Sequence, residues 1–232
     1  MVKANDDPNS IFTVLQSTGR YFSAGADIKD GSILTNDLLD NKDQYWLSKV
    51  VSRNIYLTSL FINHKKILVS CLNGPVIGLT AALICLSDLI YCFNDKDVFL
   101  LLPFSNIGLV CEGAVSRSLL KRIGISKTNE LILLSKPIYA KELYRLGFIN
   151  KIYNLDNVKV FNNLVIEDIN NVSKNLDHQS ILDNKLLISQ DWKDDLSYSN
   201  QAEALAGFAK WCADIPQQRF KELASRGRKH KL

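Results

Sequence analysis

The segment KKILVSCLNGPVIGLTAALIC, residues 65–85, decides the fold of this chain. Its first half is an almost unbroken apolar run that ends at Asn73-Gly74, which is typical of a strand buried on both faces. Its second half begins a stretch, residues 75–92, that is apolar nearly all round and predicts one buried helix. Pro75 suits the first turn of such a helix, because its missing N–H has no partner to lose there. A buried strand followed directly by a buried helix indicates an α/β fold with parallel strands.

The segments on either side continue this alternation. Further strands are expected at residues 10–17 and 97–103, and a short extended piece at 148–154. Helices are expected at the following ranges: 44–63, 112–124, 127–135, 140–147, and most of the chain from Val158 onward. Residues 31–45 are polar and mixed, and we expect a loop there. The pattern predicts an α/β core over residues 1–155 and a helical region over 156–232.

Composition excludes several classes of protein. The chain has 232 residues, of which 47% are hydrophobic and 22% charged, so it folds around a real core and is not disordered. The longest apolar stretch is interrupted by Asp88, which favours a buried helix with a structurally paired acid over a membrane span. The polar first ten residues do not resemble a secretory signal.

Cysteine and histidine spacing indicates no metal or redox site. The five cysteines match no zinc or disulfide pattern, and the three histidines show no ligand or triad spacing. Cys111 has no basic partner nearby in the sequence, so we do not assign it as a nucleophile. We expect reduced thiols in an intracellular protein that binds no metal.

Charge is concentrated at the C-terminus. The chain carries a net charge of +4, and the last fourteen residues contain six Lys or Arg and one Glu, so the rest is close to neutral. No basic stripe with interleaved aromatic residues is present, which argues against a nucleic-acid partner.

A single carboxylate stands out in SNIGLVCEGAV, residues 105–115, where Glu112 is the only charged residue. One interpretation is a helix start, because acidic residues complement the exposed N–H groups of a first turn. The other is a general base whose pKa is raised by apolar neighbours. Local pattern alone leaves both interpretations open.

Three stretches in this order carry a family resemblance: GRYFSAGAD, LNGPVIGLTAAL and CFNDKDVFLLLPFSNIGLVCEGA. Together they resemble the crotonase superfamily of enoyl-CoA hydratases and isomerases, most closely the fungal peroxisomal Δ3,Δ2-enoyl-CoA isomerases and their paralogues. The resemblance covers residues from about Ser10 to Tyr153. It implies the crotonase ββα spiral followed by a helical C-terminal region.

The resemblance also implies a site made largely of main-chain atoms. The amides of Ala26 and Leu79 would bind the oxygen of a thioester enolate, and Glu112 would be the base. Asn54 matches an asparagine near the active site that would orient Glu112 or the thioester; an ordinary polar helix residue is an equal alternative. The loop that would contact coenzyme A comprises Ala24, Gly25, Ala26, Asp27 and Ile28.

Hydratases of this superfamily use two glutamates, and the matching positions here are Ala82 and Phe104. Dienoyl-CoA isomerases of the superfamily also need two acids, and one of them lies at the position of Phe104. Hydration and dienoyl isomerisation are therefore not expected. One acid, Glu112, is enough for the 1,3-proton shift of a Δ3,Δ2-enoyl-CoA isomerase.

Other expectations follow from the same resemblance. No cofactor is needed beyond the coenzyme A that is part of the acyl-CoA substrate. Family members form trimers or pairs of trimers, so a homo-oligomer is expected. The last three residues, His230-Lys231-Leu232, resemble a peroxisomal address read by an import receptor, which predicts a peroxisomal location.

The chain also departs from the family pattern, because the N-terminal hairpin and most of a helix are missing from it. We interpret this as a misplaced start rather than a decayed copy, since the Glu112 constellation is intact. A catalytically silent subunit that binds acyl-CoA, or assembles with an active paralogue, is the alternative function. A residual hydratase is a weaker third.

Overall fold

The computed structural model of the protein describes residues 1–27 and 40–225. Its strands form two sheets. In the larger sheet, β2 lies between β1 and β4, and β7 follows β4, with every neighbouring pair parallel. In the smaller sheet, β3 pairs parallel with β5, and β5 pairs antiparallel with β6. The strands run as follows: β1 Phe12–Leu15, β2 Ile67–Leu72, β3 Val76–Ile77, β4 Leu89–Cys92, β5 Phe99–Leu101, β6 Ile138–Tyr139 and β7 Lys151–Ile152.

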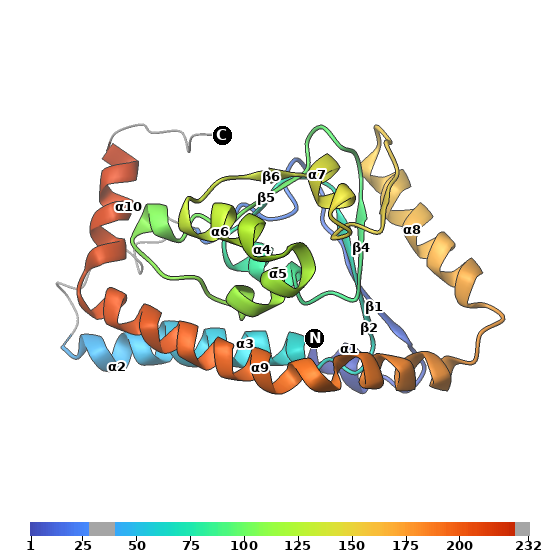
Figure 1. Ribbon diagram of the computed structural model, residues 1–232, viewed down its shortest axis with the longest axis horizontal. Helices are drawn as coiled ribbons and strands as arrows, with labels where there is room; N and C mark the ends of the chain where they lie inside the picture. Colours follow the sequence, from blue (N-terminus) through green and yellow to red (C-terminus); the bar gives the residue numbers. More distant parts are fainter. Residues whose placement is uncertain (28–39, 226–232) are drawn as a thin grey trace.

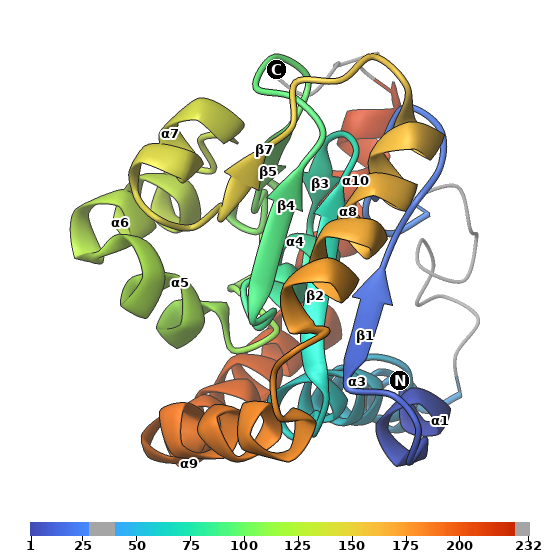
Figure 2. The same ribbon diagram turned by 90° about the vertical axis from the view of Figure 1, so that its right-hand side faces the viewer.

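Helices cover both faces of the larger sheet. In Figure 2, α8 stands on one side of β2 and β4, and α5, α6 and α7 stand on the other. The long helix α9 runs beneath the sheets alongside α3, as Figure 1 shows. The helices run as follows: α1 Val2–Asp6, α2 Lys42–Trp46, α3 Arg53–Ile62, α4 Leu79–Ile84, α5 Val115–Ile123, α6 Ile125–Leu133, α7 Ala140–Arg145, α8 Val158–Ser173, α9 His178–Cys212 and α10 Ile215–Ser225. The predicted α/β fold with parallel strands and a helical C-terminal region is confirmed.

The prediction of one helix over residues 75–92 is wrong. Residues 76–77 form β3 instead, because the carbonyl of Pro75 accepts hydrogen bonds from the amides of Phe22 and Ser23 and holds this segment extended. The helix begins only after Gly78, whose φ of +70° favours glycine and lets the chain turn. It ends at Ile84, and Leu89–Cys92 forms a strand that pairs with β2.

The expected helix over residues 44–63 is present but begins earlier. The side chain of Asn41 accepts a hydrogen bond from the Gln44 amide and caps α2, which therefore takes residues 42–45 out of the expected loop. Residues 28–39 of that loop lie outside the described residues. A π-helical turn at Leu47–Ser52 joins α2 to α3. Such turns add one residue to the helical register and often mark functional sites.

Helix α9 is tied to the core at both ends. Near its C-terminal end Trp211 stacks on Trp46 of α2, with ring centroids 4.5 Å apart. Toward its N-terminal end Lys185 forms an ion pair with Asp88, with the two charged atoms 2.6 Å apart. The predicted structural pairing of Asp88 is confirmed. Asp88 directly precedes strand β4, however, and does not lie in a helix as the prediction for residues 75–92 implied. These contacts place the middle of α9 against α3 and α5.

Candidate active site

Two backbone segments meet at the N-terminal end of α4. Ser23 forms a parallel bridge with Val76, and its carbonyl accepts the Ile77 amide at 3.0 Å. Its hydroxyl also bonds the Thr80 hydroxyl at 2.9 Å. Just beyond, Gly25 and Gly78 approach so closely that a Cβ on Gly78 would lie 3.8 Å from the Gly25 Cα. The loop that carries Ala26 is therefore fixed beside the start of the helix that carries Leu79.

The amides of Ala26 and Leu79 are the predicted oxyanion donors. Leu79 is the first residue of α4, so its N–H has no intrahelical partner. Within the described residues no hydrogen bond from either amide to another main-chain carbonyl is recorded. The Leu79 N–H is therefore available to an added acceptor. Of the predicted coenzyme A loop, residues 24–27 are described and partly or fully exposed, and Ile28 lies outside the described residues.

Glu112 lies in an irregular segment just before a turn and does not begin a helix. Helix α5 starts three residues later, so the helix-start interpretation of this acid is wrong. The next residue, Gly113, has a φ of +78° and packs on the first turn of α4. A Cβ there would lie 2.9 Å from the Ala82 Cβ and 3.2 Å from the Leu79 side chain. Glu112 is therefore held next to the helix start that presents the Leu79 amide.

The surroundings of Glu112 favour its protonated form. Its side chain is 7% exposed, and this burial raises its pKa to about 7. The charge of Arg53 opposes the rise in pKa, and the charge of Glu203 adds to it. A carboxyl group with a pKa near neutrality can both accept and return a proton at physiological pH.

Asn54 is buried, with 2% of its surface exposed, and does not lie on the solvent face of α3. Its side-chain oxygen accepts two hydrogen bonds from Arg53, from Nε and from a terminal guanidinium nitrogen, both at 3.3 Å. No bond between Asn54 and Glu112 is recorded in the described residues. Arg53 therefore links Asn54 to the electrostatic surroundings of Glu112.

Sequence reasoning missed two charged residues near Glu112. Arg53 directly precedes Asn54 and carries no signal of its own. Glu203 is only 7% exposed and comes from α9, where it interrupts a run of small and apolar residues. An acidic residue in such a run is uncommon, and this was the one feature of the sequence that could have pointed to a buried role for Glu203.

The two positions matched to hydratase acids are part of the core. Ala82 is fully buried beneath Gly113, and Phe104 is 3% exposed in the same hydrophobic cluster. Neither supplies an acid. Cys111 has a pKa raised by burial to about 12, so its thiol stays protonated, as expected for a cysteine that is not a nucleophile.

No group of three or more His, Cys, Asp or Glu residues among residues 1–27 and 40–225 is arranged to hold a metal ion. Across the same described ranges, none of the helices combines the length and apolarity that a membrane crossing requires.

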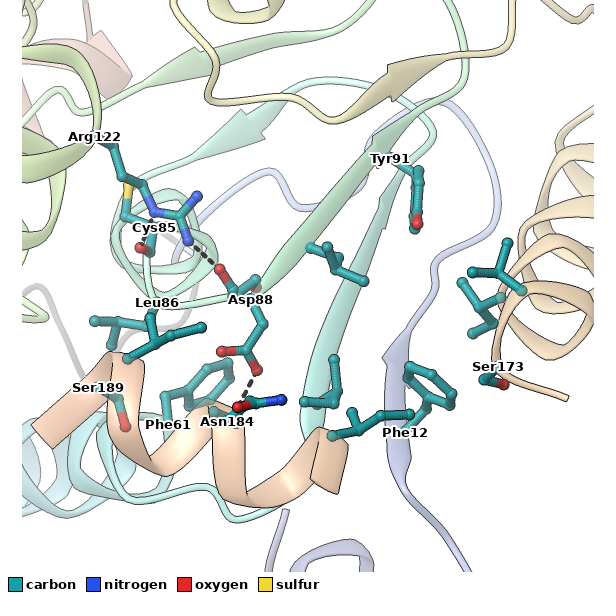
Figure 3. A pocket seen from close by; sticks show the side chains of 18 of the residues that line it. Phe12, Phe61, Cys85, Leu86, Asp88, Tyr91, Arg122, Ser173, Asn184 and Ser189 are labelled. Carbon is teal, nitrogen blue, oxygen red and sulfur yellow. Dashed lines mark hydrogen bonds and ion pairs between the residues drawn. The ribbon is translucent and has the colours of Figure 1, made fainter. Parts of the chain in front are cut away.

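A cavity of about 1010 Å³ lies apart from this site, between the larger sheet, α8 and α9. Figure 3 shows Phe12 and Tyr91 facing it from strands β1 and β4, Asp88 from just before β4, and Asn184 from α9. None of the predicted site residues lines it. Its walls are mostly apolar, and its two carboxylates, Asp88 and Asp168, are paired with Lys185 and Lys151.

Comparisons with known proteins agree with this geometry. The family model described as enoyl-CoA hydratase/isomerase matches residues 1–187. The chain is 39% identical to the 3,2-trans-enoyl-CoA isomerase of Saccharomyces cerevisiae over 226 residues, which cover 95% of this chain and 80% of that protein. It is 40% identical to the Delta(3,5)-Delta(2,4)-dienoyl-CoA isomerase of the same yeast over 236 residues, covering 99% and 85%.

Solved structures show the same fold. The crystal structure of enoyl-CoA hydratase from Bacillus halodurans superposes with a TM-score of 0.82 over 96% of this chain and 85% of that chain, at 20% identity. The protein therefore belongs to the enoyl-CoA hydratase/isomerase family. The predicted membership of the crotonase superfamily, with fungal isomerases as relatives, is confirmed. Both of these yeast relatives are named isomerases, in agreement with the prediction of an isomerase.

Proposed function

We propose that this protein is a Δ3,Δ2-enoyl-CoA isomerase, which moves the double bond of a 3-enoyl-CoA to the trans-2 position. One observation carries the proposal: Glu112 is buried, and the next residue, Gly113, packs against the first turn of the helix that presents the Leu79 amide. A base and an oxyanion donor on adjoining segments are what proton abstraction next to a thioester requires.

The reaction follows from these parts. Ionised Glu112 removes a proton from C2 of the substrate, so the C2–H bond breaks, its electron pair forms a C1=C2 bond, and the carbonyl π electrons move onto the thioester oxygen. The negative charge on this oxygen is stabilised by the Ala26 and Leu79 amides, each contributing about 3 kcal/mol. When the C=O bond forms again, the C1=C2 electrons become the C2=C3 bond, and the C3=C4 electrons take the same proton from Glu112 at C4. Coenzyme A enters as part of the substrate and lies along residues 24–28, and the proposal needs no separate cofactor and no metal.

The names of the relatives do not decide between the two isomerase reactions, because both kinds of relative are about 40% identical to this chain. Acid placement favours the 1,3-shift. The position of the second dienoyl acid is occupied by Phe104, which is buried in the core. One carboxyl group is sufficient for a proton that leaves C2 and returns to C4.

The first experiment is a steady-state assay of the purified chain with a trans-3-enoyl-CoA, following the conjugated 2-enoyl product. We expect turnover in the wild type and a loss of about 10³-fold or more in Glu112→Gln, because the amide cannot accept the proton. Glu167→Gln is the matched control, since Glu167 is an exposed glutamate of α8. A parallel assay with a 3,5-dienoyl-CoA tests the other reaction. Faster turnover of that substrate would overturn the choice of the 1,3-shift.

The alternative function is a silent subunit that binds acyl-CoA or assembles with an active paralogue. Soluble, monodisperse protein without turnover on any of these substrates would support it. Size-exclusion chromatography with and without an active isomerase then tests for a mixed assembly. Hydration of a 2-enoyl-CoA at an ordinary enzymatic rate would instead support the hydratase.

The proposed setting is peroxisomal β-oxidation of unsaturated fatty acids. Its support is the C-terminal His230-Lys231-Leu232, which lies outside the described residues and resembles an import-receptor address. A fluorescent fusion to the N-terminus should enter peroxisomes, and removal of the last three residues should leave it in the cytosol. A fusion that stays in the cytosol with the tripeptide intact would contradict this location.

A further inference from the structure

The turn that carries Glu112 is held by a second carboxylate from a distant part of the chain. Glu203 of α9 accepts a hydrogen bond from the Ser116 amide at 2.9 Å. The Ala114 amide and the Cys111 thiol lie close enough to lower the pKa of Glu203, and its second oxygen, Oε2, is buried without a hydrogen-bond partner in the described part of the chain. Glu203 thus contacts residues on both sides of Glu112.

This turn needs such support. Gly113 and Ala114 have φ angles of +78° and +59°, and for alanine the left-handed region costs about 1–2 kcal/mol. Ala114 begins α5 with no side-chain cap of its own. Glu203 supplies the missing acceptor from another helix, where its negative charge also complements the exposed first-turn N–H groups.

The next turn of α9 touches Glu112 itself. Gly207 follows Glu203 by four residues and lies on the same face of α9. A Cβ on Gly207 would lie 3.6 Å from Oε1 of Glu112. One face of α9 therefore both holds the backbone around the base and packs against its carboxyl group.

We propose that Glu203 is a positioning residue for the general base: it fixes the turn from Cys111 to Ser116 so that the Glu112 carboxyl points at the substrate. This inference rests on the proposed function of Glu112. Glu203 is given no proton transfer in this scheme, because Glu112 alone serves both C2 and C4 in a 1,3-shift.

Glu203 also sets the charge around the base. The ionisable side chains that act on Glu112 are Arg53 from α3 and Glu203 from α9, and Cys111 beside it stays protonated. Arg53 lowers the pKa of Glu112 and Glu203 raises it. Removing the charge of Glu203 should therefore lower the pKa of Glu112.

Two variants separate these effects. Glu203→Gln keeps an oxygen acceptor and loses the charge, so the acid limb of its kcat/KM profile should move to lower pH. Glu203→Ala loses the acceptor as well, so kcat should fall about 10- to 100-fold with KM changed less than about threefold. Asp177→Asn is the matched control, because Asp177 caps the start of α9 through Ser180. It should lower stability without moving either kinetic quantity.

A direct titration keeps the test independent of turnover. The carboxyl carbon of Glu112, in protein labelled with ¹³C-glutamate and assigned with Glu112→Gln, should titrate at lower pH in Glu203→Gln than in wild type. If the wild type has no turnover, the proposed function fails and this titration alone decides about Glu203. An unmoved titration with unchanged kcat in both Glu203 variants would overturn the inference and leave a stabilising cap. Turnover of a 3,5-dienoyl-CoA that disappears in Glu203→Gln would also overturn it, because Glu203 would then carry a proton.

Discussion

At the scale of single residues, the proposed role of Glu112 makes activity depend on the ionisation of its carboxyl group. Because burial raises the pKa of Glu112 to about 7, half of the molecules hold the proton near neutral pH. Only the ionised form can remove a proton from C2, so kcat/KM should rise with pH and level off above about 7. The measurement is kcat/KM for a 3-enoyl-CoA between about pH 5.5 and 8.5. A profile without an acid limb in this range would contradict the assignment.

The same raised pKa makes Glu112 a source of instability. Between its ordinary value of 4.5 and about 7, the folded state binds more protons than the unfolded state, so stability falls as pH rises through this window. Glu112→Gln removes that penalty. Urea unfolding should show the variant more stable than wild type by about 1–3 kcal/mol at pH 8, and little different near pH 4.5. Equal stability differences between variant and wild type at both pH values would contradict a raised pKa of Glu112.

The variant Gly113→Ala tests whether the packing of the segment around Glu112 against α4 matters. In Gly113→Ala the new methyl would meet Ala82 and Leu79 at 2.9 and 3.2 Å, in addition to the strain of a φ of +78°. Gly124→Ala is a matched control, with a φ of +77° and nothing within 4 Å of the new Cβ. We expect about 1 kcal/mol of destabilisation in the control and about 2–4 kcal/mol, with kcat reduced tenfold or more, in Gly113→Ala. Equal effects would show that the contact with α4 does not matter.

At the scale of elements, α9 is fastened to the larger sheet by a half-buried ion pair. Lys185 bonds both Asp88 and the carbonyl of Lys66 at 2.6 Å, and Asp88 also accepts the Leu68 amide. This arrangement satisfies the charge of Asp88 and sets where α9 crosses the strands. Glu203 and Gly207 lie further along the same helix, so the ion pair also helps to place them beside Glu112.

Lys185→Met should therefore destabilise the protein by about 1–3 kcal/mol, because it leaves Asp88 without its cation. The matched control is Lys151→Met, which breaks an equally short pair with Asp168, at 2.7 Å, whose lysine is 52% exposed. That loss should stay within about 1 kcal/mol. Urea unfolding of both variants measures the difference. A control as destabilised as Lys185→Met would contradict the special role of the pair that anchors α9.

At the scale of the whole molecule, the outer face of α9 is unusually apolar for a surface. Leu187, Ile188, Tyr198 and Leu205 are all more than half exposed. Exposed apolar side chains on one helix commonly mark interfaces, which agrees with the expectation of a homo-oligomer. Glu203 and Gly207 lie on the same helix. A displacement of α9 at such an interface would therefore also move the residues that contact Glu112 and its turn.

We therefore expect a solution mass that is a multiple of 26.1 kDa, as measured by light scattering after size-exclusion chromatography. Leu187→Glu combined with Tyr198→Glu should reduce the mass, because burying two new charges at an interface is unfavourable. Gln190→Glu adds charge at an exposed polar position of the same helix and should leave the mass unchanged. A wild type that elutes as a monomer would contradict the proposed assembly.

Local patterns in the sequence were sufficient for much of this molecule. The apolar run at residues 67–72 is a buried strand, and the alternation of strands and helices is an α/β fold, because burial of both faces of a strand needs helices to cover them. The order of three short motifs was sufficient for the family. Residues 75–92 show where local patterns are insufficient. Their apolar residues fit one buried helix as well as a strand, a helix and another strand. Pairing with Ser23 and with β2 decided between them.

The sequence by itself determined the class of fold, the family and the presence of one acid, Glu112, in an apolar run. Tertiary structure decided what surrounds that acid. Arg53 and Glu203 lie 59 residues before and 91 residues after Glu112 in the chain, and no periodicity links such distances. Their charges act on Glu112 only because α3 packs against α9 and α9 packs against α5. Glu112 is buried there, and burial makes electrostatic interactions strong.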